Sequence, residues 1–147
     1  MIIYSSTKSR FNEDVNLNRI SDIILRNLRE KGVAGGQHAE YMSWQNSLHY
    51  MRAAIDDPAI AGDVQVAIEY QIPRTSKRVN FMIAGANKDS KSNVVVVELK
   101  QWEKAEKVED DIYNTWLEEA PLFDKTQVLQ LRDFIKRFVT KRSGAAI

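Results

Sequence analysis

The residues best suited to chemistry end an apolar run, Val-Val-Val-Val-Glu-Leu-Lys, at positions 94–100. Side chains alternate along a β-strand, so Glu98 and Lys100 are expected on the same face, two residues apart. Four consecutive valines predict a strand covered on both faces, where a charge is costly unless it is paired or bound. The run therefore predicts either a functional pair or, as the plainer alternative, a Glu/Lys pair that reaches solvent where the strand frays.

A third polar residue, Asn80, precedes Glu98 by the length of a hairpin. If the two strands pair around the polar stretch GANKDSKSN, Asn80 comes to lie beside Glu98. Two oxygen donors and the ammonium group of Lys100 then surround one point. Mg²⁺ takes oxygen ligands and keeps several waters, and a nearby Lys can orient a metal-bound water. This set of residues predicts the chemistry of phosphodiester hydrolysis with Mg²⁺ or Mn²⁺.

Other catalytic signatures are absent from the sequence. It has no GxxxxGK[ST] loop, no GxGxxG after a strand and no HExxH, which excludes the usual nucleotide-cradling and zinc-hydrolase sites. The lack of Cys excludes thiolate metal sites and thiol nucleophiles, and it fits a reducing compartment. His38 and His49 have no partner at metal-ligand spacing, so we interpret them as ordinary surface or core residues.

Apolar periodicity predicts helices before and after the strands of a small sheet along the chain. Helical spacing indicates helices over 18–31, 39–55, 108–116 and from an N-cap at Asp124 onward. Alternation predicts strands over 64–72 and 78–84, followed by the valine strand. The short links favour a three-stranded antiparallel meander flanked by helices, in a mixed α/β (α+β) fold.

Length and composition indicate one globular domain over residues 1–147, with 44% hydrophobic and 28% charged residues. No apolar run reaches the length of a signal peptide or a membrane span, so we expect a cytoplasmic protein without a membrane partner. The net charge of +1 does not by itself indicate a polyanion partner. Basic residues nevertheless cluster in the middle and at the end of the chain: Arg74, Lys77, Arg78, Lys88, Lys91, Lys100, Lys104, Arg132, Lys136, Arg137, Lys141 and Arg142.

The strings RVNF and VVVVELKQW resemble the motif of the PD-(D/E)XK nucleases, a restriction-endonuclease-like superfamily in which an Asp ends one strand and E-x-K lies on the next. Longer stretches are similar to the N-terminal nuclease-like domain of bacterial proteins that carry a Schlafen-like P-loop helicase. These stretches are EYMSWQNSLHYM, VAIEYQIPRTSKRVNFMIAG, VVVVELKQWEKAE and EEAPLFDKTQVLQLRDFIKRFV. The resemblance covers most of the chain from the second helix onward, and ELKQW and IPRTSKR are its most specific parts.

The resemblance implies a role for each matching residue. Glu98 would be a metal ligand and Lys100 the water-positioning base or electrostatic stabiliser, while Asn80 stands where the family has Asp. Glu40 matches an acidic position that can complete the metal site, and it could equally be a surface residue. The second acidic candidate is Glu69, which alternation places on the face of its strand away from the apolar side. Nucleic acid, DNA rather than RNA, would be contacted by Arg74, Lys77 and Arg78. Gln101, which follows the Lys as in the family string, would either contact the nucleic acid or fix the end of the strand.

Two departures from the family pattern affect the expected activity. Asn80 keeps a carbonyl oxygen but removes one negative charge, so weaker Mg²⁺ binding and a loss of activity are expected. Three explanations stay open: an inactive or purely nucleic-acid-binding relative, a deliberate silencing change, or compensation by another carboxylate. The chain is also shortened between Lys104 and Asp111, where relatives carry a longer segment that covers the edge of the third strand. An open edge predicts a homodimer or an exchanged segment.

The alternative to a nuclease is a non-catalytic module that binds nucleic acid or a protein. It would use the basic turn and the final helix, whose Arg132, Lys136, Arg137 and Lys141 lie mostly away from the apolar stripe. Trp44, Trp102 and Trp116 are stacking platforms in this reading and core residues otherwise.

Overall fold

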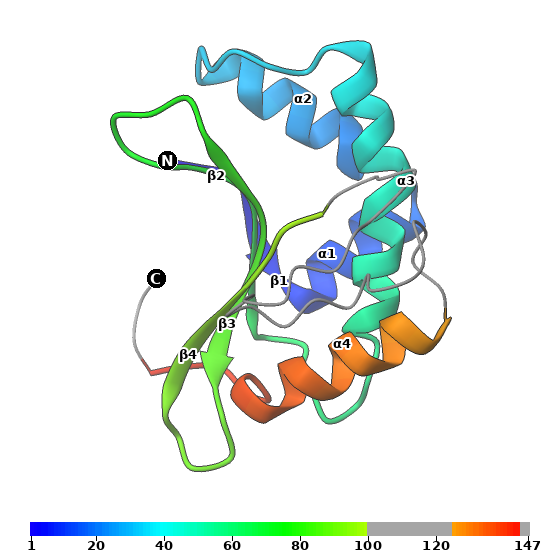
Figure 1. Ribbon diagram of the computed structural model, residues 1–147, viewed down its shortest axis with the longest axis vertical. Coiled ribbons are helices and arrows are strands. Elements are labelled where there is room, and N and C mark those ends of the chain that lie inside the picture. The colour runs from blue at the N-terminus through cyan, green and yellow to red at the C-terminus, as the bar shows by residue number, and fades with distance from the viewer. Residues whose placement is uncertain (100–124, 145–147) are drawn as a thin grey trace, which may run out of the picture.

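The computed structural model describes residues 1–99 and 125–144, except the side chains of 125–127, and forms an α+β fold. Its strands make one antiparallel sheet in the order β1-β2-β3-β4, with the helices on one side (Figure 1). The elements are β1 (Ile2–Thr7), α1 (Lys8–Asn16), α2 (Ile20–Glu30), α3 (His38–Ala54), β2 (Gln65–Gln71), β3 (Arg78–Ala86), β4 (Ser92–Val97) and α4 (Lys125–Phe138). The predicted fold class, with its meander of β2, β3 and β4, is confirmed.

The first strand and the first helix lie outside the elements that periodicity predicts. Strand β1 pairs with β2 in antiparallel register, Tyr4 opposite Ile68, although three helices separate the two in sequence. Its buried residues Ile3 and Tyr4 are adjacent, so it lacks the alternation that marks a strand. The Thr7 hydroxyl accepts the backbone N–H of Arg10 and caps the start of α1.

The hydrophobic core lies between the sheet and the helices that cover it. Phe11 of α1 packs edge to face against Phe81 of β3, with ring centroids 5.5 Å apart. The apolar stripe of α2 buries Ile24 and Leu28 completely, as the spacing of that helix predicts, and α3 adds Leu48. This packing holds α3 against the sheet along one wall of the pocket described below. No helix among the described residues is long and apolar enough to cross a membrane.

The valine strand β4 is covered on one face only, so the prediction of burial on both faces is wrong. Val95 and Val97 are buried, whereas Val94 and Val96 are 53% and 57% exposed. Within the described part of the chain, the helices lie on one side of the sheet (Figure 1). Because side chains alternate along a strand, every second valine of β4 turns away from the helices. The valine run therefore reflects the β-propensity of a branched side chain rather than burial on both faces.

The last helix, α4, packs through Leu131 and Ile135, as predicted, but part of its basic face serves the fold. Arg132 donates to the carbonyl oxygens of the last two residues of α3, at 3.3 and 2.6 Å. Lys136 pairs with Asp57 at 3.2 Å. Two of the four cations assigned to a nucleic-acid face are therefore already bound within the protein. Three predictions fall outside the described residues: the helix over 108–116, the N-cap at Asp124, and the roles of Trp102 and Trp116.

Candidate functional site

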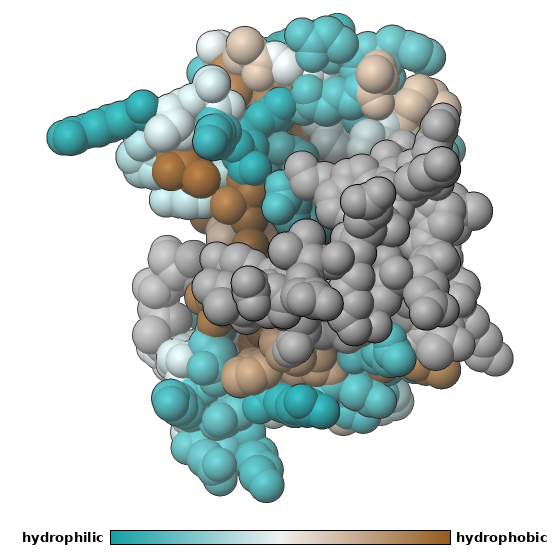
Figure 2. Space-filling view, viewed as in Figure 1, coloured by the Kyte–Doolittle hydropathy of each residue, from teal (hydrophilic) through white to brown (hydrophobic). Residues whose placement is uncertain are grey.

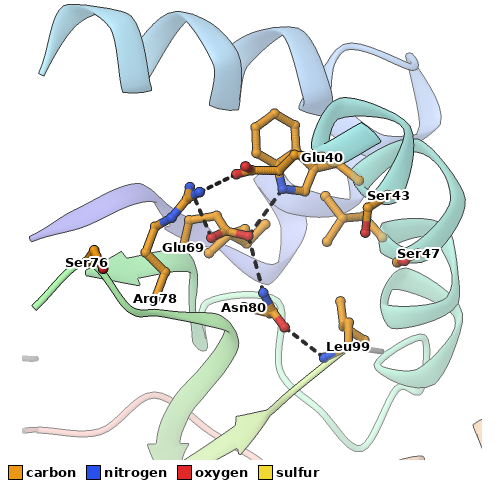
Figure 3. Close-up of a pocket in the computed structure, with 11 residues that line it drawn as sticks. Glu40, Ser43, Ser47, Glu69, Ser76, Arg78, Asn80 and Leu99 are labelled. Atoms are coloured by element: carbon orange, nitrogen blue, oxygen red, sulfur yellow. Dashed lines mark hydrogen bonds and ion pairs between the residues drawn. The ribbon is translucent and has the colours of Figure 1, made fainter. Parts of the chain in front are cut away.

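A pocket of about 290 Å³ opens between α3 and the ends of the strands where β3 begins and β4 stops. Figure 3 shows side chains from the helix and from two strands pointing into it. Its apolar wall is formed by Trp44, Leu48, Ile68 and Leu99. Its polar lining consists of Glu40, Ser43, Ser47, Glu69, Ser76, Arg78 and Asn80.

Glu69 is buried at the centre of this site, which overturns its predicted place on the face away from the apolar side. Its φ is +57°, in the left-handed region, although it lies within β2. Regular pairing continues on both sides, with Ile68 opposite Phe81 and Tyr70 opposite Val79. The local change in backbone direction points the carboxylate toward α3, where Trp44 donates its indole N–H at 3.2 Å. A non-glycine residue in this conformation costs about 1–2 kcal/mol, so the surrounding contacts must hold it there.

Arg78 lies between two carboxylates from different elements. Its Nη2 bonds to Oε1 of Glu40, on α3, and its Nη1 lies 3.3 Å from Oε2 of Glu69. The Arg78 side chain is 15% exposed, compared with 25% for Glu40 and 6% for Glu69. One guanidinium therefore partly neutralises the buried carboxylate of Glu69 and the partly exposed carboxylate of Glu40, and the three side chains form a single electrostatic unit. Removing one partner of the buried Arg78–Glu69 pair is strongly destabilising.

Burial raises the pKa of Glu69 above its ordinary value. The guanidinium of Arg78 and the indole N–H of Trp44 oppose this shift because both favour the charged carboxylate, whereas the neighbouring charge of Glu40 adds to it. The net effect is a carboxyl group that takes up a proton more readily than a free Glu. A buried, perturbed carboxyl group in a pocket is a feature that active sites share.

Asn80 connects this carboxylate to the end of β4. Its amide nitrogen donates to Oε1 of Glu69 at 3.5 Å, and its amide oxygen accepts the backbone N–H of Leu99 at 3.0 Å (Figure 3). Both halves of the amide are used, and an ionised Asp in the same place could accept but not donate. Asn80 therefore fits the present hydrogen bonds better than the Asp of the family pattern.

The structure places the predicted metal-site residues in two groups. Asn80 and Glu40 both line the pocket, and Asn80 bonds to the backbone next to Glu98. The Glu98 side chain itself is exposed beyond the end of β4, and it is Leu99 that lines the pocket. Lys100 and Gln101 lie outside the described residues.

The predicted phosphate-binding residues of the β2–β3 turn differ in their exposure to solvent. Arg74 and Lys77 are exposed in the turn, where Arg74 has a φ of +65°. Arg78, assigned to the same surface, is turned inward to its two carboxylates. The guanidinium of Arg78 is therefore paired within the protein. Of the three predicted contacts, the exposed Arg74 and Lys77 are the ones that can bind a phosphate.

A glycine loop positions Glu40. The backbone N–H of Gly36 donates to Oε2 of Glu40 at 3.4 Å. Gly35 has a φ of +141°, and a Cβ added there would lie 2.8 Å from Nη2 of Arg78. The sequence identifies this stretch as a loop through its glycines, but no local signal shows that it packs against the site. The sequence also carries no local signal for the role of Trp44. Its helical spacing indicates a core residue and does not show that it donates a hydrogen bond to Glu69.

The described donor set does not fit a divalent cation in this pocket. The two carboxylates are bound by Arg78, and the amide oxygen of Asn80 accepts a backbone N–H. Among the residues that the structure describes, no group of three or more His, Cys, Asp or Glu could hold a metal ion. No step of a mechanism is therefore assigned to a metal ion at this pocket.

No known family pattern, curated protein or solved structure matches the chain. The resemblance to PD-(D/E)XK nucleases accordingly stands on its own sequence strings, and the functional argument on the geometry of the pocket.

Proposed function

We propose that this chain is a nuclease-type domain of the PD-(D/E)XK kind, and that in this copy it binds nucleic acid without hydrolysing it. The observation that carries the proposal is the place of Asn80. It lies in a pocket with Glu40 and Glu69 and bonds to the strand end that leads into Glu98 and Lys100. Of the three motif positions, Asn80 thus lines the pocket and bonds to the backbone next to Glu98.

The charge balance of the pocket supports the proposed loss of hydrolysis. Two carboxylates face one guanidinium, which leaves a single formal negative charge near Asn80. An Asp at position 80 doubles that charge and adds a third carboxylate. Mg²⁺ binds weakly to neutral amide oxygens and depends on carboxylates for its affinity. Because Asn80 is neutral, it does not supply the negative charge that a metal ligand for cleavage requires at this position.

Plasmid cleavage in Mg²⁺ or Mn²⁺ tests the proposal. The unchanged protein is expected to leave the plasmid intact, and Asn80→Asp to cleave it. Adding Lys100→Ala to Asn80→Asp should abolish that cleavage, because the ammonium group would position the attacking water. Asn46→Asp, on the exposed surface of α3, is the control for an added charge. Cleavage by the unchanged protein, or none by Asn80→Asp, overturns the assignment.

A second candidate is a module that binds nucleic acid or a protein and has no nuclease site to restore. It is favoured by the inward ion pairs of Arg78, which hold the carboxylates of Glu40 and Glu69 within the protein. In this function the exposed Arg74 and Lys77 contact phosphates directly. Phosphate contacts give a steep dependence of affinity on salt, about one log unit of affinity per log unit of salt for each contact. Binding that is insensitive to salt would instead identify a protein partner.

We also propose that two copies associate along β4. Among the described strands, β4 pairs with β3 alone, and its Val94 and Val96 are exposed. An unpaired strand edge is a template for pairing with another chain. Sedimentation at increasing concentration should show a dimer, and a monomer throughout would refute the association.

A further inference from the structure

The end of the sheet farthest from the pocket carries a second polar structure, made of the β3–β4 hairpin and the chain after α4. Strand β3 begins at the pocket with Arg78 and ends at Ala86, next to the hairpin. There the backbone N–H of Ala86 donates to the carbonyl of Lys141 at 2.8 Å, and Thr140 donates back to Ala86 at 2.8 Å. The side-chain amine of Lys141 also reaches the hydroxyl of Ser90, at 2.8 Å. Residues 87–92 and 140–144 therefore form one unit, here named the basic tip.

The basic tip concentrates positive charge on a nearly neutral chain. Lys88, Lys91, Lys141 and Arg142 are all exposed, and the only acid in these two stretches is Asp89. The tip thus has a formal charge of +3, whereas the whole chain has +1. The remainder of the chain is accordingly negative, and a polyanion is drawn to this end of the molecule.

Hydrogen bonds hold the backbone that carries Lys88 and Lys91 in a defined turn. The side-chain oxygen of Asn87 accepts the backbone N–H groups of Asp89 and Lys91, at 3.0 and 2.9 Å. Ser90 completes the turn with a φ of +64°. On the other side, the hydroxyls of Ser92 and Ser143 bond to each other across the unit. An ordered backbone loses less conformational entropy on binding than a free loop does.

We propose that the basic tip binds the sugar-phosphate backbone of nucleic acid. Lys and Arg supply charge for phosphates, and Ser and Asn supply the additional hydrogen bonds that such contacts use. Both kinds of residue are present, and Figure 2 shows hydrophilic side chains at the lower end of the molecule, where Figure 1 places the hairpin. A lipid-binding surface would also carry aromatic or large apolar residues, and residues 87–92 and 140–144 contain none.

This surface acts in addition to the proposed nuclease-type pocket and does not depend on it. It lies at the opposite end of β3 from Asn80, so nucleic acid held at both places would run along the sheet. Failure of Asn80→Asp to cleave DNA would refute the pocket assignment and leave binding at the basic tip intact. Loss of binding in tip variants would be seen whether or not any cleavage occurs.

The test is the affinity of the full chain for a fluorescent DNA duplex and for a single strand, measured by anisotropy at several salt concentrations. Lys88→Gln/Lys91→Gln is compared with Arg26→Gln/Arg29→Gln, which removes the same charge from the exposed face of α2 at the other end of the molecule (Figure 1). Two lost phosphate contacts should weaken binding about 50-fold at about 0.1 M salt and reduce the salt slope by about 1.8. Asp89→Asn, which raises the charge of the tip, should bind more tightly than the unchanged protein.

Four results would overturn the proposal. The first is that neither nucleic acid binds to the unchanged protein at low salt. The second is that the tip variant and the α2 control lose affinity equally, which would indicate a general charge effect. The third is that the tip variant binds DNA normally but no longer binds vesicles of phosphatidylcholine and phosphatidylserine in equal parts. The Asp89→Asn variant decides the matter if the Lys variants fold poorly, because unchanged affinity there also contradicts the proposal.

Discussion

Replacing Asn80 with Asp adds one negative charge beside Glu69 while keeping the size of the side chain. The amide nitrogen that now donates to Glu69 becomes a carboxylate oxygen, so one hydrogen bond turns into a repulsion. The other oxygen keeps its bond from the backbone N–H of Leu99. The substitution therefore changes the electrostatics of the pocket with little change in its packing.

The size of the effect follows from the distance that separates Asn80 and Glu69. Two unit charges at the 3.5 Å of the present hydrogen bond repel by about 5 kcal/mol at an effective dielectric constant of about 20. The guanidinium of Arg78, 3.3 Å from Glu69, offsets part of this repulsion. We therefore expect Asn80→Asp to lower the free energy of unfolding by about 2–4 kcal/mol at neutral pH. Acid should restore most of the loss, because one of the two carboxyl groups then becomes protonated.

Urea unfolding with and without Mn²⁺ or Mg²⁺ provides the assay. A cation that binds only the folded Asn80→Asp variant should return about 2.7 kcal/mol at about 100 times its dissociation constant. Asn80→Ala separates the lost hydrogen bonds from the added charge and should not respond to the cation. Asn46→Asp, which adds the same charge on the exposed surface of α3, should leave the free energy of unfolding nearly unchanged.

The reasoning fails if Asn80→Asp is as stable as the unchanged protein at neutral pH. It also fails if the variant is destabilised to the same extent with and without divalent cation, because the added carboxylate would then not complete a metal site. A response to cation in Asn80→Ala would show that the metal binds elsewhere on the chain.

Three further substitutions test the contacts around the pocket and behind it, each by urea unfolding. Burial raises the pKa of Glu69 above its ordinary value. The unchanged protein should therefore lose stability relative to Glu69→Gln as pH rises from the unfolded-state to the folded-state pKa, by about 1.4 kcal/mol for each pH unit between the two. A constant difference across pH would contradict the burial argument. Arg78→Met removes the ion-pair partner of the buried Glu69 and of the partly exposed Glu40, and it should cost about 3–5 kcal/mol, part of which Glu40→Gln restores in the double variant; no restoration would mean that the guanidinium acts through packing. Arg132→Gln removes the bonds to the last carbonyls of α3 and should cost about 1–3 kcal/mol, whereas a loss equal to that of the exposed Arg137→Gln would show that these bonds contribute nothing.

The elements whose signal is local can be predicted from the amino-acid sequence. The apolar spacing of Ile24 and Leu28 predicts the buried stripe of α2, and alternation predicts β2 and β3. The hairpin length places Asn80 near the end of the valine strand, and its bond to Leu99 agrees. These predictions succeed because side-chain period and turn length constrain a helix or hairpin without reference to the rest of the chain.

Which charged groups enter the pocket depends instead on how the elements pack in three dimensions. Alternation assigns Glu69 to the other face, and only a left-handed residue within β2, held by contacts from α3 and β3, reverses that assignment. Arg78 faces inward because Glu40, 38 residues earlier in the chain, meets it there. The pairing of β1 with β2 likewise depends on a partner that lies beyond three helices. A local pattern carries no information on such distant partners, because the energy that selects them arises only when the elements pack together.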